Sequence, residues 1–206
     1  MPPPSRFRDE PIGPRTVHLC VDMQRLFAGD TEWAYPWMPR VIPHVAAICE
    51  QHADRTIFTR FIPAAAPGEG AGIWARYYER WANMTLERVG PDMIELVPEL
   101  QRFLPPARMI DKGVYSPWLG SDLRSHLSAA GADTVVVTGG ETDVCVLASV
   151  LGAVDWGYRT IVVTDALCSS ADEGHDALLF LFTTRYGQQI ETMTTGELLE
   201  RWQRTG

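Results

Sequence analysis

Short apolar runs recur along the chain, each rich in β-branched residues and without the polar alternation of a strand that has one solvated face. Unbroken runs of this kind are typical of strands buried on both faces of a sheet. They predict strands over residues 17–22, 56–61, 108–111, 134–138, 160–164 and 189–192.

Amphipathic stretches separate these runs and predict helices over residues 41–53, 74–83, 119–130, 142–156, 173–186 and 197–203. The stretch 121–129 shows the signals well: Ser121 opens it, Leu123 and Leu127 lie on one face, and Gly131 can end it. Regular strand–helix alternation implies parallel strands joined by right-handed crossovers. We therefore expect an α/β protein, a three-layer α/β/α sandwich.

The length of 206 residues suits one compact core. Residues 1–15 are rich in proline and charge, and we expect a flexible N-terminal arm followed by a single domain over residues 16–206. Residues 63–72 (PAAAPGEGAG) are the most flexible interior stretch and precede an aromatic cluster. They fit a lid and a plain surface connection equally well.

The charge balance narrows the function classes. Lys plus Arg is 18 and Asp plus Glu is 26, giving a net charge of −8. This disfavours nucleic acid and membrane surfaces as partners, because both attract basic proteins. The four cysteines form no CxxC pair, and no signal peptide or membrane-spanning run stands out. Reduced thiols in a cytoplasm are the simplest interpretation.

Reactive side chains follow three of the predicted strands. Asp22 closes the first, Lys112 closes the third, and Cys145 comes just after the fourth. In parallel α/β sheets, ligands bind beyond the carboxyl ends of the strands, so these residues are expected at one edge. A thiol nucleophile, a carboxylate that accepts its proton and a cation between them can cleave a carbonyl compound.

The turn Gly139–Gly140 precedes a helix whose first turn holds Cys145. Free N–H groups there, together with a nearby Lys112, are expected to lower the pKa of the thiol and to hold an oxyanion. Taken singly, each residue has a plainer interpretation. A free cysteine is usually a small buried apolar residue, which is how we interpret Cys20, Cys49 and Cys168, and an Asp–Lys pair is usually a surface ion pair. The joint placement favours the catalytic interpretation.

Three blocks of sequence resemble a known family: VDMQRLF around Asp22, DKGVYSPW around Lys112 and TGGETDVCV around Cys145. They are similar to the signature blocks of the isochorismatase-like cysteine hydrolases, which include nicotinamidases and N-carbamoylsarcosine amidohydrolases. The resemblance runs over residues 16–195. It implies a six-stranded, mainly parallel sheet, a catalytic triad of Asp22, Lys112 and Cys145, and assembly into homo-oligomers, dimers or tetramers.

The resemblance also implies a cis peptide between Gly140 and Glu141, which turns the N–H of Glu141 towards the oxyanion beside the N–H of Cys145. Asp165 and His175 are expected to pack or cap rather than to catalyse. Arg25 stands where the family often has Asn. Glu141 stands where the family usually has a small or hydroxyl residue. We expect its side chain to point outward, or to meet a cationic group or a donor on the substrate.

Nicotinamidases carry a histidine-containing metal site after their second strand. The matching stretch here, residues 59–72, contains no histidine, and the five histidines of the chain show no ligand spacing. We therefore expect no metal and no cofactor, and nicotinamidase activity is disfavoured.

Aromatic residues are dense between the first and third blocks. The candidates for a pocket wall are Phe27, Trp33, Trp37, Phe61, Trp74, Tyr77, Tyr78, Trp81, Tyr115 and Trp118. Helical spacing of residues 74–81 fits core packing or an oligomer interface as well. Phe27, Trp74, Tyr78 and Trp118 are the predicted substrate-binding residues, which implies an apolar or aromatic part on the substrate.

The leading hypothesis is a cytoplasmic, metal-independent cysteine hydrolase that cleaves a C–N bond, amide or ureido, of a small molecule through a thioester. Two alternatives stay open. One is an isochorismatase-type vinyl-ether hydrolase, which needs the Asp without the thiol. The other is a non-catalytic, thiol-bearing assembly module on the same scaffold.

Overall fold

The computed structural model describes residues 10–202 and contains one sheet of parallel strands in the order β3-β2-β1-β4-β5-β6. The strands are β1 (Thr16–Val21), β2 (Thr56–Phe61), β3 (Arg108–Lys112), β4 (Thr134–Gly140), β5 (Arg159–Cys168) and β6 (Ile190–Met193). All six predicted strands are confirmed. The order reverses between β1 and β4, which opens a crevice at their carboxyl ends.

Burial explains why these segments became strands. Every residue of β1 and of β4 is buried. The two strands therefore form the centre of the sheet and are covered on both faces. β5 continues four residues beyond its predicted end, to Cys168, after a register shift against β4 between Val137 and Gly139.

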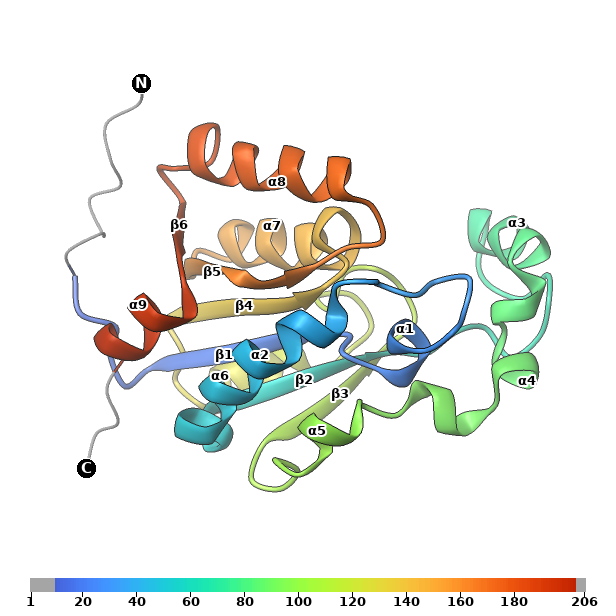
Figure 1. The fold of residues 1–206 in the computed structure, drawn as a ribbon, viewed down its shortest axis with the longest axis horizontal. Coiled ribbons are helices and arrows are strands. Elements are labelled where there is room, and N and C mark those ends of the chain that lie inside the picture. The colour runs from blue at the N-terminus through green and yellow to red at the C-terminus, as the bar shows by residue number, and fades with distance from the viewer. Residues whose placement is uncertain (1–9, 203–206) are drawn as a thin grey trace.

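Helices cover both faces of the sheet (Figure 1). One face carries α2 (Met38–His52), α9 (Thr195–Arg201), α1 (Arg25–Ala28) and α5 (Pro98–Gln101), which enclose a core around Phe58 and Ile48. The other carries α6 (Leu123–Ala129), α7 (Leu147–Asp155) and α8 (Asp172–Thr184), packed on Leu19 and Val137. The three-layer α/β/α architecture is thus the one that the sequence predicts.

The segment with α3 (Ile73–Arg80) and α4 (Leu86–Val89) lies beyond the carboxyl ends of the strands, at the right of Figure 1. Short 3-10 turns, Ala53–Arg55, Ala82–Met84 and Pro91–Ile94, accompany the helices. Sequence analysis missed α1, α4 and α5 because each has only four residues, too few for a helical period. The last predicted helix begins at Thr195, where Thr194 and Glu197 form a capping box, and its predicted end, Gln203, lies outside the described residues.

Most of the expected N-terminal arm lies outside the described residues. In its described part, residues 10–15, one side chain is buried and two carbonyl groups are hydrogen-bonded. Ile12 is 5% exposed in the core, and Arg159 donates hydrogen bonds to the carbonyl oxygens of Glu10 and Pro11.

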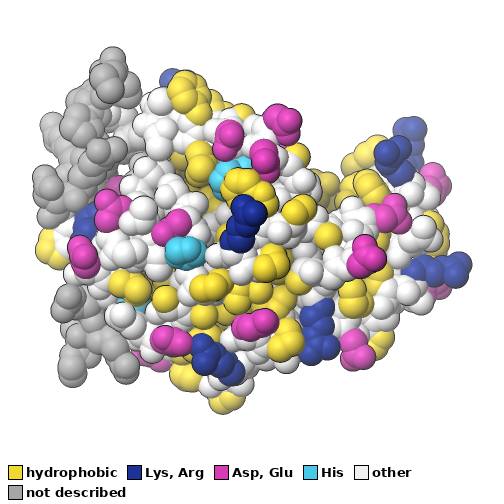
Figure 2. All heavy atoms as spheres, viewed as in Figure 1, with side chains coloured by type: hydrophobic (Ala, Val, Ile, Leu, Met, Phe, Trp, Pro, Cys, Tyr) yellow, Lys and Arg dark blue, Asp and Glu magenta, His cyan; other side chains and the backbone are white. Residues whose placement is uncertain are grey.

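The surface carries charges of both signs. On the face in Figure 2, acidic and basic side chains are interspersed, with hydrophobic side chains between them. Within residues 10–202, none of the helices combines the length and the apolar character needed to cross a membrane.

Candidate active site

Three strand ends bring one carboxylate, one ammonium and one thiol into contact. Asp22 follows β1, Lys112 is the last residue of β3, and Cys145 lies in the turn after β4. The Nζ of Lys112 lies 2.7 Å from Oδ2 of Asp22 and 3.4 Å from Sγ of Cys145. It also donates a hydrogen bond of 3.2 Å to the carbonyl of Val114. Lys112 therefore links the other two side chains.

The turn before Cys145 depends on its two glycines. Gly139 has φ +102°, and a Cβ there would collide with the backbone of Val21. A Cβ on Gly140 would lie 2.5 Å from the ring of Tyr35. The peptide bond between Gly140 and Glu141 is cis. The chain then forms a π-helical turn, Thr142–Val146, which contains Cys145 and leads into α7.

Asp22 is fixed by Thr59 on the neighbouring strand β2. The hydroxyl of Thr59 donates a 2.5 Å hydrogen bond to Oδ1 of Asp22 and accepts one of 3.1 Å from the Asp22 backbone N–H. Asp22 has φ +50°, a left-handed conformation that aspartate tolerates better than most residues. Lys112 and Thr59 thus occupy different carboxylate oxygens, and the side chain is held in one orientation.

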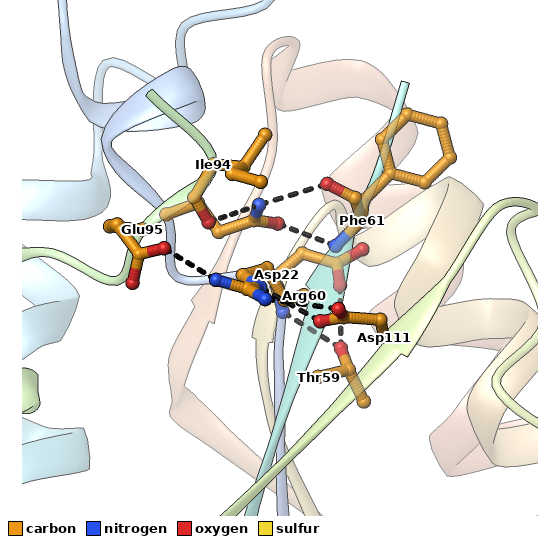
Figure 3. A network of polar contacts seen from close by, with 8 residues as sticks. Asp22, Thr59, Arg60, Phe61, Ile94, Glu95 and Asp111 are labelled. Carbon is orange, nitrogen blue, oxygen red and sulfur yellow. Dashed lines mark hydrogen bonds and ion pairs between the residues drawn. The ribbon is translucent and has the colours of Figure 1, made fainter. Parts of the chain in front are cut away.

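Two more polar side chains brace this region. Gln24 exchanges hydrogen bonds with the backbone of Phe61, at 2.9 and 2.7 Å, and donates another to the carbonyl of Ile94. Arg60 makes a bidentate contact to Asp111 on β3, at 2.7 and 2.9 Å, and reaches Glu95 at 2.5 Å (Figure 3). Together they tie β1, β2, β3 and the loop before α5 into one unit behind Asp22.

The electrostatics of the site differ from the sequence-based expectation. Burial raises the pKa of the Cys145 thiol, the Asp22 carboxylate raises it further, and Lys112 only partly opposes them. Burial alone would lower the pKa of Lys112, but the charge of Asp22 and the sulfur of Cys145 raise it above its usual value. The expected lowering of the thiol pKa is therefore wrong in direction, and Lys112 instead forms an ion pair with Asp22 in which both side chains are fully buried.

A cavity of about 280 Å³ opens onto Cys145. Most of its wall is aromatic. Phe27, Trp33 and Tyr35 come from the segment after β1, and Phe61 ends β2. Tyr77 and Trp81 come from α3 and its end, and Tyr115 follows β3. We call these seven residues the aromatic wall. Glu32, Glu141, Val144 and Ser170 complete the lining.

Only one of the four predicted pocket residues, Phe27, lines this cavity. Trp118 lies on the other side of the sheet, where its indole N–H donates a hydrogen bond to the carbonyl of Ser149. Its ring packs against Gly152, so closely that a side chain there would collide with it. Tyr78 is 2% exposed in the core, and Trp74, which does not line the cavity, packs against Tyr115 with ring centroids 4.9 Å apart. These three assignments are corrected.

The side chain of Glu141 turns towards the start of the loop after β5. Its Oε1 accepts hydrogen bonds from the hydroxyl of Ser170, from the Ser170 N–H at 3.2 Å and from the Ser169 hydroxyl at 3.4 Å. The residue nevertheless lines the cavity. Its carboxylate is thus held at the mouth of the site beside Cys145.

The remaining residues singled out in the sequence do not line the cavity, and several make contacts that hold the fold together. Asp165 accepts hydrogen bonds from the backbone and side chain of Thr195 at the start of α9, and His175 bonds to the hydroxyl of Thr142 at 2.9 Å. Arg25 sits on α1, where its backbone N–H bonds to Glu95. Cys20, Cys49 and Cys168 are buried and free. Between residues 10 and 202 there is no cluster of three or more His, Cys, Asp or Glu that could hold a metal ion.

Sequence analysis missed Thr59, Gln24 and Tyr35. A usable signal existed for Gln24. It stands two residues after Asp22, close to the end of a buried strand, and a polar side chain buried there needs hydrogen-bond partners. The position of Thr59 opposite Asp22 follows from strand register, which a single sequence does not reveal. Tyr35 stood outside the aromatic candidates although its ring stacks on Phe27 at 4.8 Å.

The chain is similar in sequence and in fold to known proteins. Residues 16–195 match the family model described as the Isochorismatase domain. The chain is 34% identical to maleamate amidohydrolase of Pseudomonas putida, over 75% of this chain and 76% of that protein. It is 26% identical to nicotinamidase 3 of Arabidopsis thaliana, over 78% of this chain and 77% of that one. A crystal structure of a cysteine hydrolase from Pseudomonas syringae pv. phaseolicola 1448A shares the fold, with TM-score 0.80, 24% identity and coverage of 97% and 96% of the two chains.

Proposed function

The chain belongs to the isochorismatase family and is a hydrolase of that family, and from this premise we propose that it cleaves the C–N bond of a small amide or ureido compound through a thioester on Cys145. The observation that carries the proposal is the position of Lys112, whose Nζ contacts both Asp22 and Cys145 at the base of the cavity. The amidohydrolase and nicotinamidase relatives support the bond type.

In the first half of the reaction, Asp22 accepts the thiol proton as sulfur attacks the carbonyl carbon and a C–S bond forms. The negative charge that develops on the carbonyl oxygen is held by the backbone N–H groups of Glu141 and Cys145. The C–N bond then breaks, and the nitrogen leaves as ammonia or an amine with the proton that Asp22 returns. Because the pKa of the thiol is raised, the proton moves during attack and not before it.

In the second half, water adds to the thioester carbonyl and gives a proton to Asp22. The C–S bond breaks, the sulfur recovers that proton, and the acid is released. Lys112 keeps its charge throughout and stabilises Asp22 whenever the carboxylate is ionised. No step uses a metal ion.

The test is a panel of small amides and ureides with the wild type, Cys145→Ala, Asp22→Asn and Asp22→Ala. We expect the Cys145 and Asp22 variants to lose activity, chelator to have no effect, and an acyl adduct to appear on Cys145 by mass spectrometry. If Cys145→Ala keeps activity on this panel while Asp22→Ala loses it, the thioester route fails; the same pattern on a vinyl ether, with no amide cleaved, replaces C–N cleavage by vinyl-ether cleavage. If the wild type cleaves none of the panel and Cys145 forms no adduct, hydrolysis at this site fails altogether.

We also propose a homo-oligomer, dimer or tetramer, in a reducing compartment such as the cytoplasm. Exposed apolar side chains support the first point: Phe180 on α8 is 65% exposed and Trp156 is 50% exposed. Four free cysteines support the second. Light scattering on the purified protein tests the oligomeric state, and a monomeric mass contradicts it.

A further inference from the structure

The cavity beside Cys145 combines an aromatic wall with two carboxylates, and we propose that it selects amides whose non-reacting end carries a cationic alkylammonium group. This proposal rests on the proposed function and specifies its substrate class. Neither the C–N bond nor the contact of Asp22, Lys112 and Cys145 requires a cationic substrate; the residues that line the cavity favour one.

The aromatic wall presents several rings to the same small space. The ring of Trp33 lies within 6.3 Å of four others: Phe27, Phe61, Tyr77 and Trp81. Some of these pairs are stacked and others tilted or edge-on, so the rings that line the cavity differ in orientation. A ring face carries partial negative charge and attracts alkylammonium groups, whose methyl groups it also contacts through dispersion.

Carboxylates supply the charged part of the lining. Oε1 of Glu141 is held by Ser169 and Ser170, and within residues 10–202 its Oε2 has no hydrogen-bond or ion-pair partner. Glu32 lies on the rim, where one oxygen accepts a 3.3 Å hydrogen bond from Asn83. Two carboxylates therefore border a space whose lining is mostly aromatic.

Positive charge is missing from the lining. Among the described residues that line this cavity there is no Lys, Arg or His. The ammonium of Lys112 is fully buried below it and is neutralised by Asp22 at 2.7 Å. An anionic substrate would meet the two glutamates without a partner cation, and loss of its hydration would go uncompensated. A cationic one would exchange its hydration for ring faces and a carboxylate.

The size of the cavity limits the ligand. A volume of about 280 Å³ is at the lower end for small-molecule sites. With the reacting carbonyl at Cys145, the space accommodates a short spacer and a trimethylammonium-sized group. Larger aromatic amines would require the wall to move.

Three amides of matched size test the proposal: trimethylammonioacetamide, its neutral isostere 3,3-dimethylbutanamide, and the anion succinamate. We expect kcat/KM for the cation to exceed that for the neutral isostere by about tenfold, and succinamate to be the poorest. Glu141→Gln should reduce the cation-to-neutral ratio several-fold. Glu99→Gln, an exposed substitution outside this cavity, should leave the ratio unchanged.

Binding separates this proposal from the proposed function. With Cys145→Ala, calorimetry should show tighter binding of trimethylammonioacetamide than of 3,3-dimethylbutanamide, by about tenfold, and weakened preference when Glu141→Gln is added. If the wild type hydrolyses the neutral or anionic amide as well as the cation, selectivity fails while hydrolysis stands. If no amide is hydrolysed yet the cation binds preferentially, hydrolysis fails while the cation site stands. Equal binding of both isosteres overturns the cation site.

Discussion

The hydroxyl of Thr59 holds both the backbone and the side chain of Asp22. It accepts a hydrogen bond from the Asp22 N–H and donates one to the Asp22 carboxylate. The register between β1 and β2 creates this contact across 37 residues of sequence. The carboxylate oxygen that faces Lys112 is thereby left to the ion pair.

Replacing Thr59 by valine keeps the shape of the side chain and removes both hydrogen bonds. We expect kcat to fall roughly ten- to a hundredfold, because a hydrogen bond to a charged group contributes about 1.5–3 kcal/mol. Thr59→Ser keeps the hydroxyl and should retain most of the activity. Steady-state kinetics on any hydrolysed amide checks this, and equal rates for the two variants would show that Thr59 does not orient Asp22.

Lys112→Met leaves the Asp22 charge buried without its partner. The free energy of unfolding should fall by about 3–5 kcal/mol, the usual cost of breaking a buried pair from one side. Adding Asp22→Asn removes the orphaned charge, so the double variant should be more stable than Lys112→Met alone. Urea unfolding of the single and double variants measures the difference. A double variant less stable than Lys112→Met would contradict the ion pair.

The protonation of Cys145 is open to chemical trapping. Because burial and the Asp22 charge raise the pKa of the thiol, alkylation by iodoacetamide should keep accelerating above about pH 8.5, where an ordinary cysteine levels off. Asp22→Asn removes the charge that raises the pKa and leaves Lys112, which lowers it. That variant should be alkylated faster at pH 7 while amide hydrolysis is lost.

Peptide mapping identifies which cysteine is alkylated. The Cys145→Ala variant gives the background alkylation of the three other buried cysteines. A wild-type alkylation rate that already levels off at neutral pH would indicate a preformed thiolate. The first half of the proposed reaction would then begin without proton transfer to Asp22.

His18 predicts a pH dependence of stability. Burial, and secondarily His52, lowers its pKa to about 3, whereas the unfolded chain has a value near 6.5. The stabilisation is therefore complete above pH 6.5 and is lost as pH falls towards 3, by about 1.4 kcal/mol per pH unit at the steepest. His18→Gln should flatten this slope in urea unfolding between pH 7 and 4.

Thr138→Val provides the matched control. It removes the 2.7 Å contact to Nε2 of His18 but keeps the imidazole, so it should lower stability at every pH and preserve the slope. If His18→Gln retains the wild-type slope, another group accounts for the acid sensitivity.

The two glycines before Glu141 should respond differently to added side chains. Gly140→Ala places a Cβ against the ring of Tyr35 and should cost about 1–3 kcal/mol, which Tyr35→Ala should partly restore. Gly139→Ala meets the backbone of Val21 at positive φ, so no side-chain substitution should rescue it. Thermal unfolding of the variants distinguishes the two cases, and rescue of Gly139→Ala by Tyr35→Ala would contradict the geometry.

The strands were predictable because burial on both faces leaves a strong apolar signal, and the meeting of Asp22, Lys112 and Cys145 was expected because parallel strands end at a common edge. The thiol chemistry was not, because the balance between burial, Asp22 and Lys112 depends on depth in the fold. A helix start and a nearby lysine can be predicted from the sequence, but the degree of burial of the Cys145 sulfur cannot.

The pocket wall was only partly predictable. Trp74, Tyr77, Tyr78 and Trp81 share one short segment, and rotation of α3 about its axis decides which rings face the cavity. Helical spacing places residues on a common face but does not say what that face meets. Trp118 was misassigned because proximity to Lys112 in sequence does not fix the side of the sheet on which a loop residue packs.

The reactive groups stand on strand ends of the sheet, whereas Tyr77 and Trp81 belong to an excursion beyond it that the central strands do not need for pairing. The part of the aromatic wall that Tyr77 and Trp81 supply is thus encoded apart from Asp22, Lys112 and Cys145. Exchange of residues 73–84 is a route by which a lineage could reshape this side of the cavity while inheriting the same three polar side chains, and a directed-evolution library could begin with those codons.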